Sequence, residues 1–365
     1  MAGGEVTSEA SPVLRSRTVT LLMLAAVAAS LLVSTVAPMA TAVVGLILFG
    51  VLHNLLEIRY VVGRFSSLLT PPFLYLLAAL VAAVAVSRLV SGMAPGPARL
   101  AEIVLGYAIL AAAAQHGLDG RRRVTAWVLL ALAAVVSLAF PAYHFLALTH
   151  LHNVVPLFFL WDWSRRIASP RGRRAFRAVQ VLWAVVVPVA LLAGLVPWAL
   201  SAHPGMVSSV VGDGESFLAS VTPPGAAGAL AVRVLVVFAF AQTMHYVVWV
   251  ALLPRVAPDA SAAFEARVPW ATGPRLWAAG FVAAAVFAVL FGVDFDQGKA
   301  LYAALASCTT YLELPVLLVL LAGGAPAAGG SGGTVIPLPG TRTVTTELPA
   351  GTPNEAPAEA GRHSA

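Results

Sequence analysis

The sequence predicts an all-α polytopic membrane protein, a bundle of about ten transmembrane helices. The first observation is composition: 59% of the 365 residues are hydrophobic and only 10% are charged, whereas a soluble domain carries about 25% charged residues. The second is that long apolar runs recur along the chain, most of them close to the ~20 residues that cross a bilayer as a helix. The third is that basic residues concentrate in alternate connections between these runs.

Ten apolar runs are the predicted spans, and prolines mark several of their boundaries. Pro38 separates the first two runs, Pro71 opens the third and Pro141 ends the fifth, because proline lacks a backbone N–H and its ring clashes with the preceding helical turn. Pro188 and Pro197 predict kinks in the seventh span. The predicted spans are 19–37, 40–62, 71–90, 97–116, 124–140, 142–163, 178–200, 229–253, 276–293 and 300–321.

The first run allows two interpretations. It could be the core of a signal peptide that is cleaved near Ala37, but such cores run about 7–15 residues and this one is longer. An uncleaved first span is therefore favoured. The polar segment before it, 1–18, is predicted to be cytoplasmic, and 19–321 to form the transmembrane helical domain.

The C-terminal segment, 322–365, differs sharply in composition from the rest. It consists mostly of Gly, Ala, Pro, Thr and Ser and contains no aromatic residue. Such a segment cannot bury enough apolar surface to fold, so we expect a disordered tail. Cys308, in an apolar run, is the single cysteine of the sequence. One cysteine excludes an internal disulfide and any site built from several thiolates.

The distribution of basic residues predicts the orientation. With a cytoplasmic N-terminus and ten alternating spans, 16 Arg residues fall on the cytoplasmic side, four basic residues on the other, and two in the tail. This asymmetry is typical of membrane proteins and favours both ends inside. It also explains the net charge of +6, so no nucleic-acid partner is expected. The predicted location is the cytoplasmic membrane of a bacterium.

Polar residues at membrane depth gather in spans two, six, eight and ten, whereas the odd-numbered spans carry almost none at that level. An ionisable side chain there costs about 2.5 kcal/mol or more when charged, so we expect each to have a partner or a function. His53 and Glu57 are four residues apart and therefore share one helix face. The set comprises His53, Asn54 and Glu57; Thr149, His150, His152 and Asn153; Gln242 and His245; and Thr309, Thr310 and Glu313.

Helical bundles build metal and cofactor sites where side chains of facing helices converge. Imidazole and carboxylate without thiolate suit iron, with copper, manganese and zinc as alternatives. The predicted metal ligands are His53, Glu57, His150, His152 and His245, where His150 and His152 compete because they point to different sides of one helix. Glu57 and Glu313 are predicted catalytic groups, and Asn54, Asn153, Gln242 and Tyr60 are predicted to support the ligands.

Each residue also has a competing interpretation. A histidine in a span can be a hydrogen-bonded packing residue, and Glu57 can pair with Arg59 or Arg64 at the inner surface. The coincidence of four helices favours a shared site. The chain has no Gly-rich phosphate loop, no HExxH motif and no Ser nucleophile elbow, which are the signatures of other enzyme classes.

The intramembrane pattern LHNLLE around His53, HLHN around His152 and QTMHYVVW around His245 resembles the Brp/Blh-type membrane proteins. The resemblance implies a histidine-bound iron inside the membrane and cleavage of β-carotene to retinal. That family carries HGxxD-like and HxxxH-like motifs, whereas this chain has HNLLE and a single HY, and its predicted spans are more numerous.

Three hypotheses follow from the pattern. The first is an iron-dependent oxygenase or desaturase that acts on a hydrophobic small molecule or lipid, such as a carotenoid, an isoprenoid or an acyl chain. The second is a proton-coupled transporter or channel that uses the same His and Glu residues as a relay. The third is a haem-binding membrane protein with two histidine ligands. The sequence leaves the substrate, the metal and the oligomeric state open.

Overall fold

A computed structural model describes residues 16–196 and 200–323, and in these ranges the chain is helical and contains no strand. Nine of its helices are long and apolar enough to cross a membrane, which confirms the predicted all-α polytopic bundle. These helical spans are Arg17–Val36, Pro38–Arg64, Pro71–Gly92, Pro95–Gly117, Gly120–Ala139, Pro170–Leu192, Gly228–Val256, Gly273–Val293 and Phe295–Leu321. The predicted tail falls outside the described residues except for its first two, and the predicted orientation stays a prediction.

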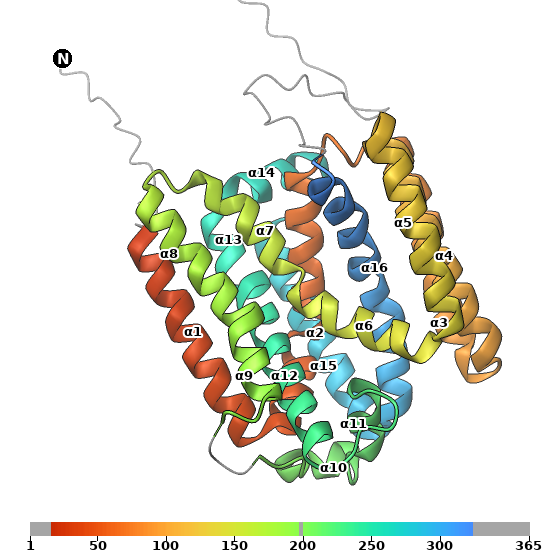
Figure 1. The fold of residues 1–365 in the computed structure, drawn as a ribbon, viewed down its shortest axis with the longest axis vertical. Helices are drawn as coiled ribbons and strands as arrows, with labels where there is room; N and C mark the ends of the chain where they lie inside the picture. The colour runs from red at the N-terminus through yellow and green to blue at the C-terminus, as the bar shows by residue number, and fades with distance from the viewer. Residues whose placement is uncertain (1–15, 197–199, 324–365) are drawn as a thin grey trace, which may run out of the picture. The chain divides into compact units, whose positions relative to one another are not determined.

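The helices follow one another with short connections (Figure 1). The first five spans are α1 (Ser16–Val36), α2 (Pro38–Arg64), α3 (Pro71–Leu89) with the 3₁₀ turn η1 (Val90–Gly92), α4 (Pro95–Gly117) and α5 (Gly120–Ala139). The later ones are α8 (Pro170–Val181), which continues through the π-helical η3 (Leu182–Val186) into α9 (Val187–Leu192); α12 (Gly228–Tyr246), which continues through the π-helical η5 (Val247–Leu252) into α13 (Leu253–Val256); α15 (Gly273–Val293); and α16 (Phe295–Leu321).

The sixth span differs from the single helix predicted over 142–163. It consists of α6 (Pro141–Val154) and α7 (Pro156–Trp163), followed by the 3₁₀ turn η2 (Ser164–Arg166). Pro156 has no N–H to offer to the carbonyl of His152, and its ring clashes with a continuing turn. As a result α6 runs across the bundle and α7 turns to run along it (Figure 1).

Two predicted loops contain short helices. The connection 201–228 carries the 3₁₀ turn η4 (Gly205–Val207), α10 (Ser208–Val211) and α11 (Glu215–Val221). The connection 254–275 carries α14 (Pro258–Arg267), which packs against the C-terminal half of α2. Gly63 permits this approach, because a Cβ there would stand only 1.9 Å from the backbone oxygen of Ala260.

The three long helices that carry the intramembrane polar residues form the centre of the bundle. In the apolar stretches of the spans that contain α12, α2 and α16, 83%, 61% and 61% of the residues are buried, against 11% in α5. Peripheral helices instead expose large apolar side chains, such as Leu132 of α5 and Val282 of α15. A lipid-facing surface is expected to be apolar, so polarity inside and apolar side chains outside fit a membrane protein.

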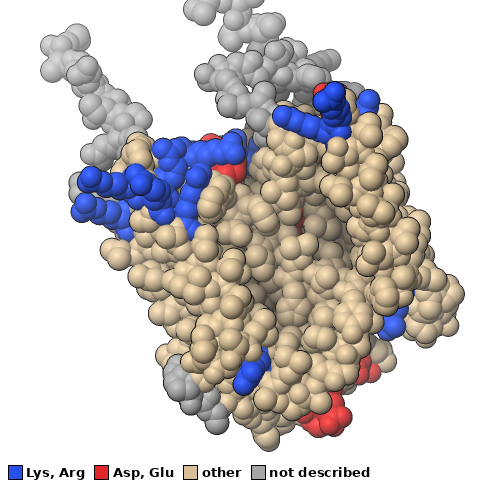
Figure 2. Space-filling model, in the orientation of Figure 1, with Lys and Arg blue, Asp and Glu red and all other residues tan. Residues whose placement is uncertain are grey.

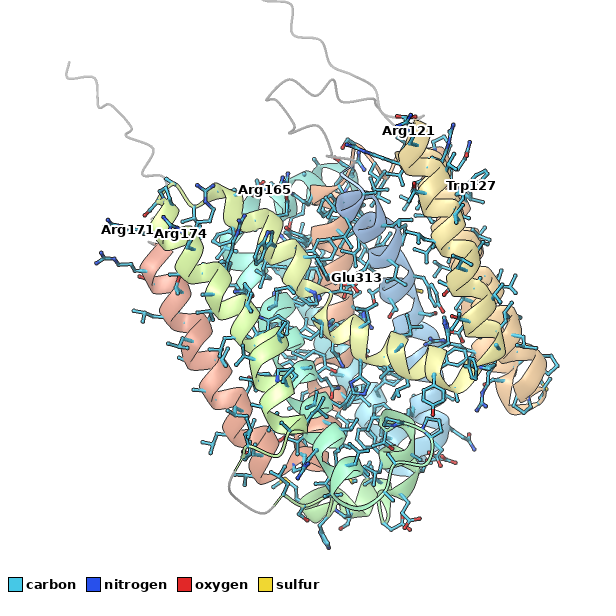
Figure 3. All side chains as sticks on the ribbon, in the orientation of Figure 1. Arg121, Trp127, Arg165, Arg171, Arg174 and Glu313 are labelled. Atoms are coloured by element: carbon cyan, nitrogen blue, oxygen red, sulfur yellow. The ribbon has the colours of Figure 1, made fainter. Side chains whose placement is uncertain are left out.

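The two ends of the bundle differ in charge. Arg residues gather where α5 and α8 begin and where α2 ends, and this region is called the Arg-rich end (Figure 2). Arg121, Arg165, Arg171 and Arg174 mark it in Figure 3, whereas Glu313 lies inside the bundle between the two ends. The opposite Arg-poor end, near α10 and α11, shows acidic side chains and few basic ones (Figure 2).

Candidate metal centre

Three imidazoles and one carboxylate converge in the centre of the bundle. His53 and Glu57 come from α2, His152 from α6 and His245 from α12, and each offers a ligand atom that lies within 4.8 Å of the other three. The imidazole centroids are 4.9 Å apart for His53 and His245, 4.6 Å for His152 and His245, and 6.3 Å for His53 and His152. We call these four residues the His/Glu cluster.

The local structure of α2 fixes the His53 ring. Its Nδ1 lies 2.9 Å from the carbonyl oxygen of Phe49, one turn earlier. Because a carbonyl only accepts, Nδ1 must carry the proton, which leaves the Nε2 lone pair free. Glu57 follows one turn later on the same face. Helix α2 therefore presents one imidazole nitrogen and one carboxylate to the same point.

Glu313 of α16 holds the second imidazole. His152 Nδ1 lies 2.9 Å from Glu313 Oε2, so a neutral His152 donates from Nδ1 to the carboxylate and keeps Nε2 free. Metal-binding histidines are commonly oriented by such a carboxylate. The Glu313 carboxyl also neighbours that of Glu57. Two adjacent buried carboxyl groups repel each other unless a proton or a cation lies between them.

Several polar atoms of the cluster and of the adjacent Glu313 have no hydrogen-bond partner among the described residues. They include both carboxylate oxygens of Glu57, both ring nitrogens of His245 and Oε1 of Glu313. Glu57 and Glu313 are fully buried and His245 is 1% exposed. An unsatisfied buried polar group costs about 1–3 kcal/mol, and more when charged. A bound cation would satisfy one ring nitrogen of His245 and the carboxylate of Glu57, so the donor set fits a metal ion.

The competing pairing of Glu57 with a nearby arginine is wrong. Arg59 pairs with Glu265 of α14 at 2.5 Å, and Arg64 pairs with Asp162 of α7 at 2.9 Å. Both arginines therefore have other carboxylates as partners, and Glu57 remains in the cluster.

The structure also separates the two competing histidines of α6. His152 faces the cluster, whereas His150 Nε2 lies 2.8 Å from the carbonyl oxygen of Val221 in α11, and its ring packs against Phe238. The structure therefore does not bring His150, one of the predicted metal ligands, to the cluster. The break after Val154 explains why spacing alone could not distinguish the two, because α6 approaches the centre obliquely.

The predicted supporting residues have different positions. Asn54 Oδ1 accepts a 2.8 Å hydrogen bond from Thr309 Oγ1 of α16, which ties α2 to α16 beside the cluster. Gln242 Nε2 donates to the Tyr246 hydroxyl at 2.8 Å. Asn153 is buried and lines a cavity next to the cluster. Tyr60 lies one turn beyond Glu57 and packs among aromatic rings rather than beside the imidazoles.

A cavity of about 390 Å³ leads from the Arg-poor end to His152. Its deep part is bordered by His152, Tyr246, Tyr302 and Thr310. The sequence analysis missed the two tyrosines. The glycines of α2 gave a signal for them, because a Cβ at Gly45 or Gly50 would lie 3.1 Å or 2.8 Å from the ring of Tyr246 or Tyr302. Pockets of this size commonly accept small molecules.

A buried ion pair lies in the cavity wall and was also missed. Arg88 of α3 donates to Glu102 Oε1 of α4 through Nε and Nη2, at 3.0 and 2.6 Å. The Tyr311 hydroxyl of α16 donates to the same oxygen at 3.0 Å. The sequence did indicate this pair, because it places one positive and one negative side chain in adjacent spans. Opposite charges inside a membrane are usually paired with each other.

The other side of the cluster is closed by aromatic rings. We call these rings the aromatic plug, which consists of Tyr60, Phe65, Phe159 and Trp249. The centroids of neighbouring rings in the plug are 5.5–6.4 Å apart. The Trp249 ring lies 6.4 Å from that of His245. Beyond the plug lie the ion pairs of Arg64 with Asp162 and of Arg166 with Asp259. Among the described residues, the cavity reaches the cluster from the Arg-poor side.

Three of the helices that carry these residues are irregular close to the cluster. α6 ends two residues after His152, α12 becomes π-helical at Val247, two residues after His245, and α16 contains Pro315 two residues after Glu313. Irregular turns of this kind are frequent at functional sites. No family model, curated protein or solved structure matches the chain, so the interpretation of the site depends on this geometry.

Proposed function

We propose that the protein is an integral membrane metalloenzyme that oxidises a lipid-soluble substrate with an iron ion held by the His/Glu cluster. The observation that carries the proposal is the convergence of three imidazoles and Glu57 within 4.8 Å of one another. Sites with two or three histidines and a carboxylate, and with open positions, are typical of non-haem iron oxygenases. The resemblance to the Brp/Blh-type proteins suggests the same chemistry.

In this proposal each residue has a separate role. His53 and His152 bind through Nε2, because their Nδ1 atoms are engaged by Phe49 and Glu313. His245 and Glu57 complete the ligand set, since their side-chain nitrogen and oxygen atoms form no hydrogen bond of normal geometry among the described residues. Iron in such a site supplies the activation of dioxygen that oxidation of C–H or C=C bonds requires. Glu313 orients His152 and can exchange a proton with the neighbouring Glu57.

The surroundings support a hydrophobic substrate. Between its mouth and His152 the cavity is bordered largely by apolar side chains, including Leu46, Leu148 and Phe238. A chain of carbon atoms fits such a lining, and the tyrosines at its deep end would hold water or a substrate oxygen. We place the enzyme in the cytoplasmic membrane of a bacterium, with the Arg-rich end inside.

The two alternative functions receive less support. A channel or transporter needs a route on both sides of the relay, whereas the aromatic plug closes one side. A haem between two of the histidines needs a flat space around the axis that joins them. The ring of His245 lies within 4.9 Å of both His53 and His152, where the macrocycle would have to pass.

Metal analysis of the purified full-length protein tests the proposal. We expect about one equivalent of iron after expression with iron, and losses of at least ~10-fold in metal affinity for His53→Ala, His152→Ala and His245→Ala. His150→Ala is the matched control, because it removes an imidazole from the same helix outside the cluster, and it should keep its metal.

Metal at trace levels in the wild-type protein would overturn the proposal, as would equal losses in His150→Ala and His152→Ala. A metal-free protein that takes up a solute into vesicles in response to a pH gradient would support the transporter instead. A Soret band in the visible spectrum would support haem.

A further inference from the structure

The mouth of the cavity carries more positive than negative charge. Three cations border the cavity, Arg88, Arg99 and Lys299, against the single carboxylate of Glu102. Arg88 and Glu102 neutralise each other through the ion pair in the wall. Arg99 at the start of α4 and Lys299 at the start of α16 are left over. Two cations without an ion-pair partner at the mouth of the cavity favour an anionic ligand.

Neither of the two cations has a carboxylate partner within 4 Å among the described residues. Arg99 is exposed and makes no hydrogen bond or ion pair there. Lys299 Nζ donates to Ser220 Oγ at 2.6 Å and lies 5.1 Å from the ring centroid of Phe217. The nearby Asp296 instead accepts from Ser216 at 3.1 Å. Lys299 is therefore held in place by neutral groups, and Asp296 acts on it only through space.

The acidic groups at this end do not cancel these charges at the mouth. Glu215 borders a neighbouring cavity that shares Arg99 and Ser220 with the main one, and it forms no ion pair within the described ranges. Asp294 accepts from the backbone of Gln297 at the start of α16. The main cavity thus presents a cationic rim, an apolar middle and a polar deep end at His152.

We propose that the substrate is an amphiphile with one anionic head group, a carboxylate or a phosphate, on a long apolar chain. Lys299 and Arg99 bind the head group, and Ser220, whose hydroxyl donates to the Phe217 carbonyl, holds Lys299 in place. The chain extends between α6, α12 and α16 toward the His/Glu cluster. This inference rests on the proposed function for the reaction but not for the binding. It favours an acyl chain over a neutral carotenoid, which would leave both cations unpaired.

A displacement assay on metal-depleted protein tests the binding. The full-length protein is stripped with a chelator and kept in a neutral detergent, and a fluorescent long-chain fatty acid serves as the probe. We expect palmitate or hexadecyl phosphate to displace the probe at least ~10-fold more tightly than hexadecanol, because only the anions form charge-assisted hydrogen bonds with the two cations. The tighter of the two anions identifies the head group.

Variants locate the head group. Lys299→Gln and Arg99→Gln should each weaken binding of the preferred anion by about 10-fold or more and leave binding of hexadecanol unchanged, and Lys299→Arg should restore most of the affinity. Arg233→Gln is the matched control, because Arg233 lies at the same end and bonds the carbonyl of Leu192 outside the cavity. Monodisperse elution of every variant confirms that it folds.

Three results would overturn the inference: equal displacement by hexadecanol and palmitate, unchanged affinity in both glutamine variants, or displacement by acetate or inorganic phosphate at the same concentration as by the amphiphile. Because the assay contains no metal, its failure is separate from that of the proposed function. A protein that binds iron but no anionic amphiphile refutes only the inference, and one that binds palmitate but no metal refutes only the proposed reaction.

Discussion

The two sides of the His/Glu cluster are built in opposite ways. Toward the Arg-rich end, four aromatic rings fill the space between α2, α7 and α12, and ion pairs between connections lie beyond them. Toward the Arg-poor end the same central helices border a cavity of about 390 Å³. Helix α2 and the helix formed by α12, η5 and α13 run through both sides, so on these two the difference comes from side chains. The rings of Tyr60 and Trp249 follow the cluster on these helices and close one side, whereas Leu46 and Gln242 precede it and border the cavity.

This difference favours a pocket that is open on one side of the cluster over a passage that crosses the membrane. A relay that conducts protons or solutes across a membrane needs polar groups on both sides, whereas an enzyme needs access on one side and exclusion of water on the other. The closed side also fixes the spacing of the ligand helices, because tight packing between rings resists movement. We therefore expect substitutions on the closed side to change stability and those on the open side to change ligand binding.

The largest expected effect is at Gly63, where α2 meets α14 on the closed side. In Gly63→Ala the new Cβ would lie 1.9 Å from the backbone oxygen of Ala260, and a backbone contact cannot be relieved by a rotamer. We expect a loss of more than about 3 kcal/mol, above the usual range for overpacking. Denaturant titration in mixed micelles measures it.

Gly50→Ala is the matched variant on the open side. Its Cβ would lie 2.8 Å from the ring of Tyr302, a side chain that borders the cavity and can move into it. The expected loss is about 1 kcal/mol, with a smaller cavity. Equal losses at Gly50 and Gly63 would mean that the two sides are packed alike.

A second, slightly smaller effect is expected for truncation of the aromatic plug. Trp249 is fully buried against Tyr60 and Phe159, and Trp249→Ala leaves a void. We expect a loss of about 3 kcal/mol, at the low end of the range for such changes, because separated helices remain in lipid and the transfer term shrinks. Phe145→Ala borders an existing cavity and should cost less than half as much. A larger loss at Phe145 would contradict the assignment of the open side.

The sequence predicted the membrane bundle and the central helices because both depend on composition along single helices. The polar residues of α2, α12 and α16 identified these as the interior before any contact was known. The course of α6 could not be predicted. A proline at 156 announces a break, but the direction of the helix before it depends on tertiary packing, and that direction decides between His150 and His152.

The cavity was likewise beyond prediction. It depends on which rings fill a space and which leave it open, and periodicity contains no such information. Arg88 and Glu102 illustrate the point: each lies in a predicted span or its flank, yet their pairing requires the distance between α3 and α4. The separate partners of Arg59 and Arg64 depended in the same way on tertiary packing: Asp162 lies in α7, within the predicted sixth span, and Glu265 lies in α14, which falls in a predicted loop.

The third prediction concerns the boundary between the two sides, where Glu313 holds His152. Glu313→Gln keeps the size of the side chain and removes the charge, so the imidazole is oriented less firmly and is less basic. We expect metal affinity to fall by about 10–100-fold, the usual effect of losing such a partner. The contrasting variant is Glu102→Gln, which alters a carboxylate in the cavity wall away from the ligands. Its metal affinity should remain within ~2-fold, and a larger fall would show that the cavity wall also positions the ligands.

The smallest effect is expected in the ion pairs that cover the closed side, and it depends on pH. Two hydrogen bonds of 2.7 and 2.8 Å from Arg166 to Asp259 hold the pKa of Asp259 below its usual value of 3.8. A lowered folded-state pKa adds stability above the unfolded pKa, and this is lost as the pH falls through the folded pKa. Because the Asp259 side chain is 55% exposed, we expect Asp259→Asn to cost only about 0.2–1 kcal/mol at pH 7, less at high salt, and progressively less as the pH falls below 3.8. Unfolding midpoints of both proteins at these pH values measure it. A loss as large as that of Trp249→Ala would mean that ion pairs, rather than rings, close this side.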